Sequence, residues 1–171
     1  MSAEIIIRDA VPEDISSIFE LIQKKAEFDR QMGSFSGILK ATPQKLSETL
    51  FGEIPFAKVL LVENLKQPVG FALYYFRYSS FAAQPSLWLD DLYVESGMRH
   101  QGIGSALMGK LAAIAKQYHC THLAWNAIQT NKIGVNFYRK MGAKLVTQES
   151  DILLFKAIPN VILERILKGK I

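Results

Sequence analysis

Hydrophobic residues recur with different periods along the chain, and each change of period indicates a new element. A short apolar run rich in β-branched residues, 4–8, predicts a strand. After Pro12, apolar residues recur every three or four positions, which predicts a helix with one buried face. A second, shorter helix begins at Thr42 and Pro43, after a break at 33–37. The buried positions expected in these two helices are Ile15, Ile18, Phe19, Ile22, Ala26, Leu46 and Leu50.

The middle of the chain has the pattern of strands. Apolar runs at 59–62, 69–76 and 86–94 are separated by turn-forming residues at 64–68 and 79–85. Because consecutive strands joined by short turns pair in opposite directions, we expect an antiparallel meander.

The C-terminal part alternates between helix and strand. Its expected elements are a helix at 103–118, a strand at 122–128, a helix from Asn131 to just before Gly142, strands at 144–147 and 152–156, and a helix at 159–167. The strand that ends at Val94, the first of these helices and the next strand form a βαβ unit with a parallel pair. The pattern therefore predicts a mixed α/β (α+β) fold.

Composition restricts the class of protein. The 171 residues are enough for one domain, 1–171, and 49% hydrophobic residues can form a sizeable core. The net charge of +4 is not gathered into a Lys/Arg block, so we expect no nucleic-acid partner. The single cysteine, Cys120, excludes an intramolecular disulfide, and no apolar run is long enough to span a membrane. These features predict a cytoplasmic protein without a membrane partner.

The segment 90–110 contains the most specific local signal. A strand is followed by Arg99, Gly102 and Gly104, and a helix then begins. Glycine lets the backbone approach a ligand closely, and the helix dipole places partial positive charge at the same point. We therefore expect a phosphate-bearing ligand at this turn.

Two known phosphate-binding motifs do not fit this turn. A dinucleotide-binding fingerprint requires glycine or alanine where Leu107 stands and no insertion after the strand, whereas residues 95–101 intervene here. A P-loop requires lysine after the last glycine, and Gly104 is followed by Ser105. A tight turn without a ligand remains the plain alternative.

The residues in and after this turn resemble those of a known family. Arg99-x-x-Gly102-x-Gly104, Asn131 and Asn136-Phe137-Tyr138-x-x-x-Gly142-Ala143 resemble the GNAT superfamily of acetyl-CoA-dependent N-acetyltransferases. Over nearly the whole chain the resemblance extends to diamine (spermidine/spermine-type or thialysine) N-acetyltransferases. The matching stretches are Ile7-Arg8-x-Ala10, Phe51-Gly52-Glu53-x-Pro55-Phe56, residues 69–76 and residues 89–94. The resemblance implies a central, mixed, mostly antiparallel seven-stranded sheet flanked by helices, with a βαβ acetyl-CoA-binding core.

The resemblance also implies a binding site for acetyl-CoA that contains no metal. Backbone N–H groups along the strand end would hold the pantetheine and the thioester carbonyl, and the glycine turn would bind the pyrophosphate. Asn131 resembles the family's coenzyme-contacting asparagine, and a helix N-cap is its plain alternative. The expected coenzyme-binding residues are Leu92, Tyr93, Val94, Arg99, His100, Gln101, Gly102, Ile103, Gly104, Ser105, Asn131, Gly134 and Tyr138.

Acetyl transfer to an amine needs a base and an acid. A primary amine has a reference pKa of about 10.4, so a carboxylate must accept its proton directly or through water. Strand alternation turns Asp90 and Asp91 to opposite sides, and the resemblance selects Asp90 as the base, although a pair of solvated carboxylates is the alternative. Tyr138 aligns with the tyrosine that protonates the leaving thiolate in the family; its alternative is a core tyrosine.

The acceptor side departs from the polyamine-binding relatives. Ser79 replaces an aspartate of those relatives, and losing a carboxylate weakens recognition of a distal ammonium. We therefore expect the acceptor to be a primary amine of a small diamine or polyamine or of a thialysine-like amino acid, with spermidine itself less favoured. The expected substrate-binding residues are Phe28, Asp29, Phe81, Asp90, Asp91, Trp125 and Asn126.

Two other functions are also compatible with the sequence. The acceptor could be a peptide or protein amine, or the chain could be a non-catalytic acyl-CoA-binding regulatory domain, although Asp90 and Tyr138 favour an enzyme. His119, Cys120 and His122 are interpreted as structural, because neighbouring residues cannot all point toward one metal. The resemblance implies a homodimer, in which the apolar segment 161–167 could cover a partner.

Overall fold

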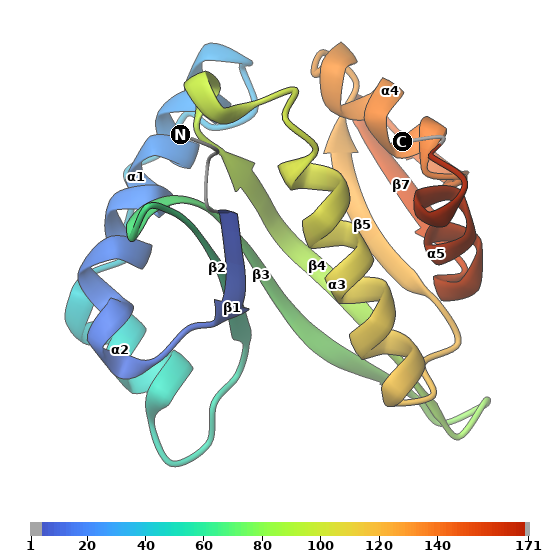
Figure 1. Ribbon diagram of the computed structural model, residues 1–171, viewed down its shortest axis with the longest axis horizontal. Helices are drawn as coiled ribbons and strands as arrows, with labels where there is room; N and C mark the ends of the chain where they lie inside the picture. The colour runs from blue at the N-terminus through green and yellow to red at the C-terminus, as the bar shows by residue number, and fades with distance from the viewer. Residues whose placement is uncertain (1–4, 170–171) are drawn as a thin grey trace. The chain divides into compact units, whose positions relative to one another are not determined.

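The computed structural model describes residues 5–169, which form a mixed α/β fold (Figure 1). The strands are β1 (Ile5–Asp9), β2 (Lys58–Asn64), β3 (Gln67–Ser79), β4 (Gln84–Val94), β5 (Leu123–Ile128), β6 (Lys144–Glu149) and β7 (Ile152–Ala157). The helices are α1 (Ile15–Gln31), α2 (Pro43–Phe51), α3 (Ile103–Gln117), α4 (Lys132–Lys140) and α5 (Pro159–Leu167), with short 3-10 turns η1 (Pro12–Asp14) and η2 (Ser96–Met98).

Hydrogen bonds join the strands in the order β1-β2-β3-β4-β5-β7-β6. β4 and β5 are parallel, with Leu87 opposite Leu123, whereas β1–β2, β2–β3, β5–β7 and β6–β7 are antiparallel. The predicted seven-stranded, mostly antiparallel sheet and its βαβ unit are therefore confirmed. Glu4, where the first strand was predicted to begin, lies outside the described residues.

The chain divides into two compact units. Unit 1 comprises residues up to Tyr74 together with Asp91–Gly104, and unit 2 comprises Tyr75–Asp90 together with the residues from Ser105 onward. The strands β3 and β4 each begin in one unit and end in the other.

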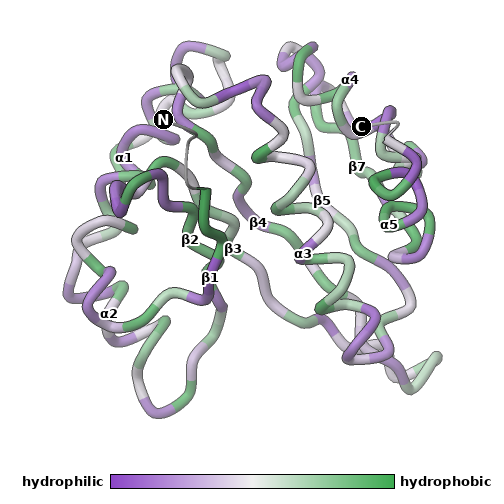
Figure 2. Tube along the Cα trace, viewed as in Figure 1, coloured by the Kyte–Doolittle hydropathy of each residue, from purple (hydrophilic) through white to green (hydrophobic). Residues whose placement is uncertain are grey.

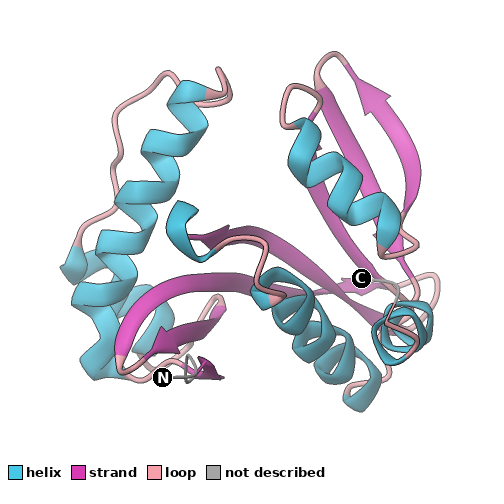
Figure 3. Cartoon of the chain, turned by 45° about the horizontal axis from the view of Figure 1, so that its top comes forward, coloured by secondary structure: helices cyan, strands magenta, loops and turns pink. Residues whose placement is uncertain are grey.

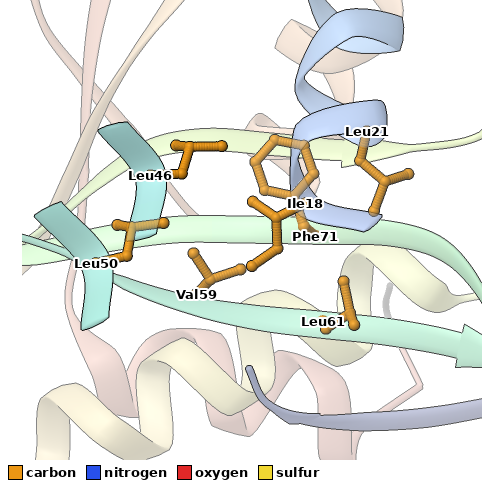
Figure 4. Packing of buried hydrophobic residues seen from close by; sticks show 7 residues of the cluster. All are labelled: Ile18, Leu21, Leu46, Leu50, Val59, Leu61 and Phe71. Carbon is orange, nitrogen blue, oxygen red and sulfur yellow. The ribbon is translucent and has the colours of Figure 1, made fainter. Parts of the chain in front are cut away.

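The core of unit 1 is formed by two helices and the strands that they cover. The Cα trace of α1 and α2 changes repeatedly between hydrophobic and hydrophilic colours, as expected for helices with one buried face (Figure 2). Their apolar side chains pack against β2 and β3, as the close view in Figure 4 shows. The residues of this cluster are Ile18, Leu21, Leu46, Leu50, Val59, Leu61 and Phe71.

An ion-pair network lies beside the beginning of α1. Asp14 accepts two hydrogen bonds from the Arg8 guanidinium, at 2.7 and 2.9 Å, and a third from the backbone N–H of Val11 at 2.8 Å. Arg8 also contacts Glu63 on β2 at 2.5 Å. Beside these contacts, residues 12–14, where the pattern predicted the first helical turn, form a 3-10 turn, and α1 follows directly at Ile15.

Asp14→Asn should destabilise the protein more at neutral pH than in acid. The hydrogen bonds from Arg8 hold the pKa of Asp14 below its ordinary value. The stabilisation is therefore complete above the ordinary carboxyl pKa of about 3.9 and disappears as the pH falls through the lower folded-state value. We expect a loss of about 1–2 kcal/mol in the free energy of unfolding at pH 7. Urea unfolding at pH 7 and pH 3 measures it; an equal loss at both pH values contradicts the prediction.

The core of unit 2 lies between helices and the strands β5 and β7. Short turns join its helices, cyan in Figure 3, to its strands, magenta. Tyr118, directly after α3, is 48% exposed, and its ring packs at a tilt against that of Phe76, with 5.0 Å between centroids. The buried face of α3 includes adjacent residues as well as residues one turn apart. These residues are Leu107, Met108, Leu111, Ala112 and Ala115.

Within residues 5–169, none of the helices combines the length and the apolar character that crossing a bilayer requires.

Candidate functional site

The glycine turn of unit 1, residues 99–104, exposes a series of backbone donors. His100 and Gly102 have φ angles of 62° and 81°, the left-handed region that glycine tolerates best, and α3 begins directly afterwards at Ile103. Within the described residues, the N–H groups of residues 100–104 have no hydrogen-bond acceptor. Consecutive free N–H groups at the beginning of a helix can bind an anion. The side chain of Gln101 donates to the Gly97 carbonyl at 3.3 Å and so links the turn to the preceding residues.

Arg99 adds a fixed positive charge to this turn. Its Nε donates to the carbonyl of Val94, at the end of β4, over 2.9 Å. Its guanidinium carbon lies 4.6 Å from the ring centroid of Phe28 and 5.8 Å from that of Tyr93. Among the described residues no carboxylate forms a salt bridge with Arg99. The charge is therefore available to a bound anion.

Two of the predicted substrate-binding carboxylates are engaged with a lysine. Lys25 on α1 forms ion pairs with Asp29, one turn later, and with Asp91 on β4 at 2.9 Å. Burial by itself lowers the pKa of Lys25, but the charges of Asp91 and Asp29 outweigh it and raise the pKa above its ordinary value. The lysine therefore stays protonated and neutralises part of the negative charge of this cluster.

Asp90, the last residue of β4 in unit 2, has different neighbours from Asp91. Its carboxylate accepts a hydrogen bond from the indole Nε1 of Trp88 at 3.3 Å, and the Arg77 guanidinium lies 4.9 Å from the Trp88 ring centroid. The Asp90 residue is exposed. Strand alternation predicted these separate surroundings, because Trp88 and Asp90 are two residues apart and share one face of the strand.

Tyr138 on α4 belongs to an aromatic cluster in unit 2. Its ring centroid lies 5.0 Å from that of Trp125 on β5 and 5.9 Å from that of Phe155 on β7. Trp125 is only 1% exposed, and its Nε1 has no hydrogen-bond partner among the described residues. Tilted aromatic packing of this kind restricts the orientation of the Tyr138 ring. Trp125 is thus a buried neighbour of Tyr138. Its role as a substrate contact stays a prediction.

Asn131 caps the helix that carries Tyr138. Its Oδ1 accepts the N–H of Gly134 at 3.0 Å, the geometry of an N-cap. A Cβ at position 134 would lie 2.7 Å from the Asn131 amide nitrogen, so a larger residue there would force the capping side chain to shift. The cap gives Asn131 and Gly134 a structural role. It uses only the Oδ1 of Asn131, so the amide nitrogen can still donate to a ligand.

The remaining predicted substrate residues lie apart from these clusters. Phe81, in the turn between β3 and β4, is fully exposed, and Asn126 is exposed on β5. Among the described residues, no group of three or more His, Cys, Asp or Glu side chains could hold a metal. Cys120 is buried, which raises the pKa of its thiol.

Sequence reasoning missed Lys25 and Trp88, although weak signals exist for both. Lys25 and Asp29 have the i,i+4 spacing of helical ion pairs. Trp88 and Asp90 have the i,i+2 spacing of residues on one face of a strand. Neither spacing reveals the contact between Lys25 and Asp91, which brings together α1 and β4.

The sequence of this chain is similar to those of known acetyltransferases. The sequence matches the model described as "Acetyltransferase (GNAT) family" over residues 23–143. It is 33% identical to the thialysine N-epsilon-acetyltransferase of Bos taurus over 154 residues, which cover 85% of this chain and 88% of that protein. It is 29% identical to spermidine/spermine N(1)-acetyltransferase-like protein 1 of Homo sapiens, over 88% of this chain and 22% of that one.

Solved structures share the fold. An integron cassette protein of V. cholerae aligns with a TM-score of 0.69 and 25% identity, covering 87% of this chain and 91% of its own. The PaiA N-acetyltransferase of Thermoplasma acidophilum, solved in complex with coenzyme A, aligns with a TM-score of 0.69 and 18% identity. That alignment covers 92% of this chain and 99% of the other.

Proposed function

Because the chain belongs to the acetyltransferase (GNAT) family, we propose that it transfers the acetyl group of acetyl-CoA to the primary amine of a small molecule. GNAT acetyltransferases use acetyl-CoA, so the enzyme class expected from the sequence is confirmed. The proposed acceptors are a small diamine and a thialysine-like amino acid. The family match includes residues of both compact units, which supports the prediction of a single acetyltransferase domain.

The glycine turn is the observation that carries the donor half of this proposal. The free N–H groups of residues 100–104 and the guanidinium of Arg99 suit a pyrophosphate, which offers several anionic oxygens. In the proposal the backbone of Leu92, Tyr93 and Val94 holds the pantetheine. Ser105, Asn131 and Gly134 complete the predicted coenzyme contacts.

Asp90 and Tyr138 carry the proton transfers in this proposal. Asp90 accepts a proton from the substrate ammonium, directly or through water, and leaves a neutral amine that can form the new C–N bond. Acetyl-CoA supplies the thioester carbonyl at which this bond forms. Tyr138 then gives its phenolic proton to the thiolate that departs as the C–S bond breaks. The attacking nitrogen releases its second proton to solvent as the amide forms, and Tyr138 regains a proton from solvent. Direct transfer is favoured over a route through Cys120, because a buried thiol with a raised pKa is a poor nucleophile.

Lys25 supports a small amine rather than a polyamine. A distal ammonium needs carboxylates that have no other cation, and Lys25 already neutralises part of the charge of Asp29 and Asp91. The proposal is tested by measuring thiol release from acetyl-CoA over a panel of small monoamines, diamines, amino acids, spermidine and an amine-bearing peptide. We expect turnover with small amines; turnover with the peptide alone contradicts the proposed substrate class.

Lys25→Met should increase the preference for diamines over monoamines. The change frees Asp29 and Asp91 to attract a second ammonium, and because these side chains are about a quarter exposed, the expected change in the ratio of kcat/KM values is about 2- to 5-fold. Lys24→Met is the matched control, since Lys24, the preceding residue of α1, pairs with Glu20 and Glu95 rather than with these two aspartates. An equal change in both variants contradicts the prediction.

We also propose that the protein is a homodimer that uses the C-terminal helix. Within α5, Val161 and Leu167 are 37% and 86% exposed, and exposed apolar side chains of this kind favour burial against a second copy. Sedimentation at micromolar concentration tests this proposal, and a monomer contradicts it.

A further inference from the structure

The guanidinium of Arg99 is held between elements of unit 1 that are distant in sequence. Phe28, near the C-terminal end of α1, lies 4.6 Å from the guanidinium carbon, within the range of a cation–π interaction. Tyr93 on β4 lies at 5.8 Å, and the two rings are 6.5 Å apart. The Nε–H bond to the Val94 carbonyl fixes the stem of the same side chain. Arg99 is therefore restrained at several points before any ligand binds.

These contacts restrain the guanidinium without using up its charge. An aromatic ring contacts the face of a guanidinium, whereas the N–H donors lie at its edge. One of the five donors is bonded to Val94, and within residues 5–169 no carboxylate pairs with Arg99. The terminal nitrogens thus remain able to bind anionic oxygens in the bidentate manner that arginine favours.

We propose that Phe28 is a positioning residue for coenzyme binding, acting through Arg99 rather than on the amine. This inference rests on the proposed function, since it takes the coenzyme pyrophosphate to be the anion that Arg99 binds. A free arginine side chain loses up to about 2 kcal/mol of conformational entropy when it is ordered. Because Phe28 orders Arg99 during folding, part of the entropy of this side chain is already lost before coenzyme binds. The entropy cost of binding is therefore smaller.

Phe28→Leu tests this role because leucine keeps an apolar side chain but removes the ring. We expect KM for acetyl-CoA and the dissociation constant of coenzyme A to rise by about 2- to 30-fold. We expect kcat to change by less than about twofold, because Phe28 does not touch the reacting atoms in the proposal. With S-acetyl-pantetheine, which lacks the pyrophosphate, kcat/KM should be nearly unchanged.

Three further variants separate positioning from general packing. Phe28→Tyr keeps an aromatic face and should restore coenzyme affinity. In the Arg99→Met background, Phe28→Leu should cause no additional loss of affinity for coenzyme A. Phe35→Leu is the matched control, because the guanidinium carbon of Arg30 lies 5.1 Å from the Phe35 ring in a similar pair that does not involve Arg99. That variant should bind coenzyme A as the native protein does.

The outcomes are distinguishable. If the native protein binds coenzyme A and Phe28→Leu binds it equally well, the inference is wrong and the proposed function stands. An equal loss with acetyl-CoA and S-acetyl-pantetheine also overturns the inference, since it indicates a general packing defect, which thermal unfolding would reveal. If the native protein neither binds coenzyme A nor turns over acetyl-CoA, the proposed function fails and the inference fails with it.

Discussion

Tyr138→Phe is expected to lower kcat by about 10²- to 10⁴-fold, the range associated with loss of a general acid. The phenylalanine ring can keep the contacts with Trp125 and Phe155, so the helix and the aromatic cluster should remain intact. Only the proton donor is removed. The dissociation constant of coenzyme A should therefore change by less than about threefold, because binding does not require the proton transfer.

Steady-state kinetics and a coenzyme A titration on the same preparations measure this separation of turnover from binding. Tyr118→Phe is the control: the Tyr118 ring also packs against an aromatic ring of unit 2, that of Phe76, but Tyr118 lies directly after α3 and has no proposed role. It should retain full activity. If Tyr138→Phe remains fully active, the leaving thiolate obtains its proton elsewhere. If the native protein binds coenzyme A but transfers no acetyl group to any amine, the non-catalytic alternative is correct.

Local signals made most of the fold predictable. Thr42 was expected to begin a short helix, and its side chain accepts the N–H of Lys45, as an N-cap does. Gly142 was expected directly after a helix, and it has the φ of 83° that favours glycine there. Such signals lie within a few residues of the elements they define. The 3-10 form of η1 was not predicted, and neither was the pairing of Arg8 with Glu63, which only the folded chain brings together.

The donor side of the candidate site was more predictable than the acceptor side for the same reason. The turn from Arg99 to Gly104 is one continuous segment, so its glycines and its helix start could be recognised together. Phe28 and Asp29 are neighbours in sequence, yet Phe28 lies against Arg99 whereas Asp29 pairs with Lys25. Which partner each side chain meets depends on how α1 packs on β4 within unit 1. Sequence position alone therefore grouped two residues that the structure assigns to different clusters.

Asp90→Asn is expected to lower kcat/KM for the amine by about 10²- to 10³-fold at pH 7, and the loss should shrink as the pH rises. The reason is the protonation of the substrate. With Asp90 present, the enzyme can use the abundant ammonium form; without it, the enzyme depends on the neutral amine. Below the amine pKa of about 10.4, the neutral fraction increases about tenfold per pH unit. The asparagine carbonyl can still accept from Trp88, so the local structure should be retained.

The pH profile of kcat/KM from pH 7 to pH 10 distinguishes this role from a structural one. The variant's activity should climb toward that of the native enzyme as free amine accumulates. Asp91→Asn provides the comparison, because Asp91 is paired with Lys25. Any loss in that variant should reflect weaker amine or α1 contacts and should keep the native pH dependence. If the kcat/KM of Asp90→Asn stays below the native value by a constant factor from pH 7 to pH 10, Asp90 is not the base. A base is dispensable only when the substrate amine has already lost its proton, so the factor must shrink as the pH rises.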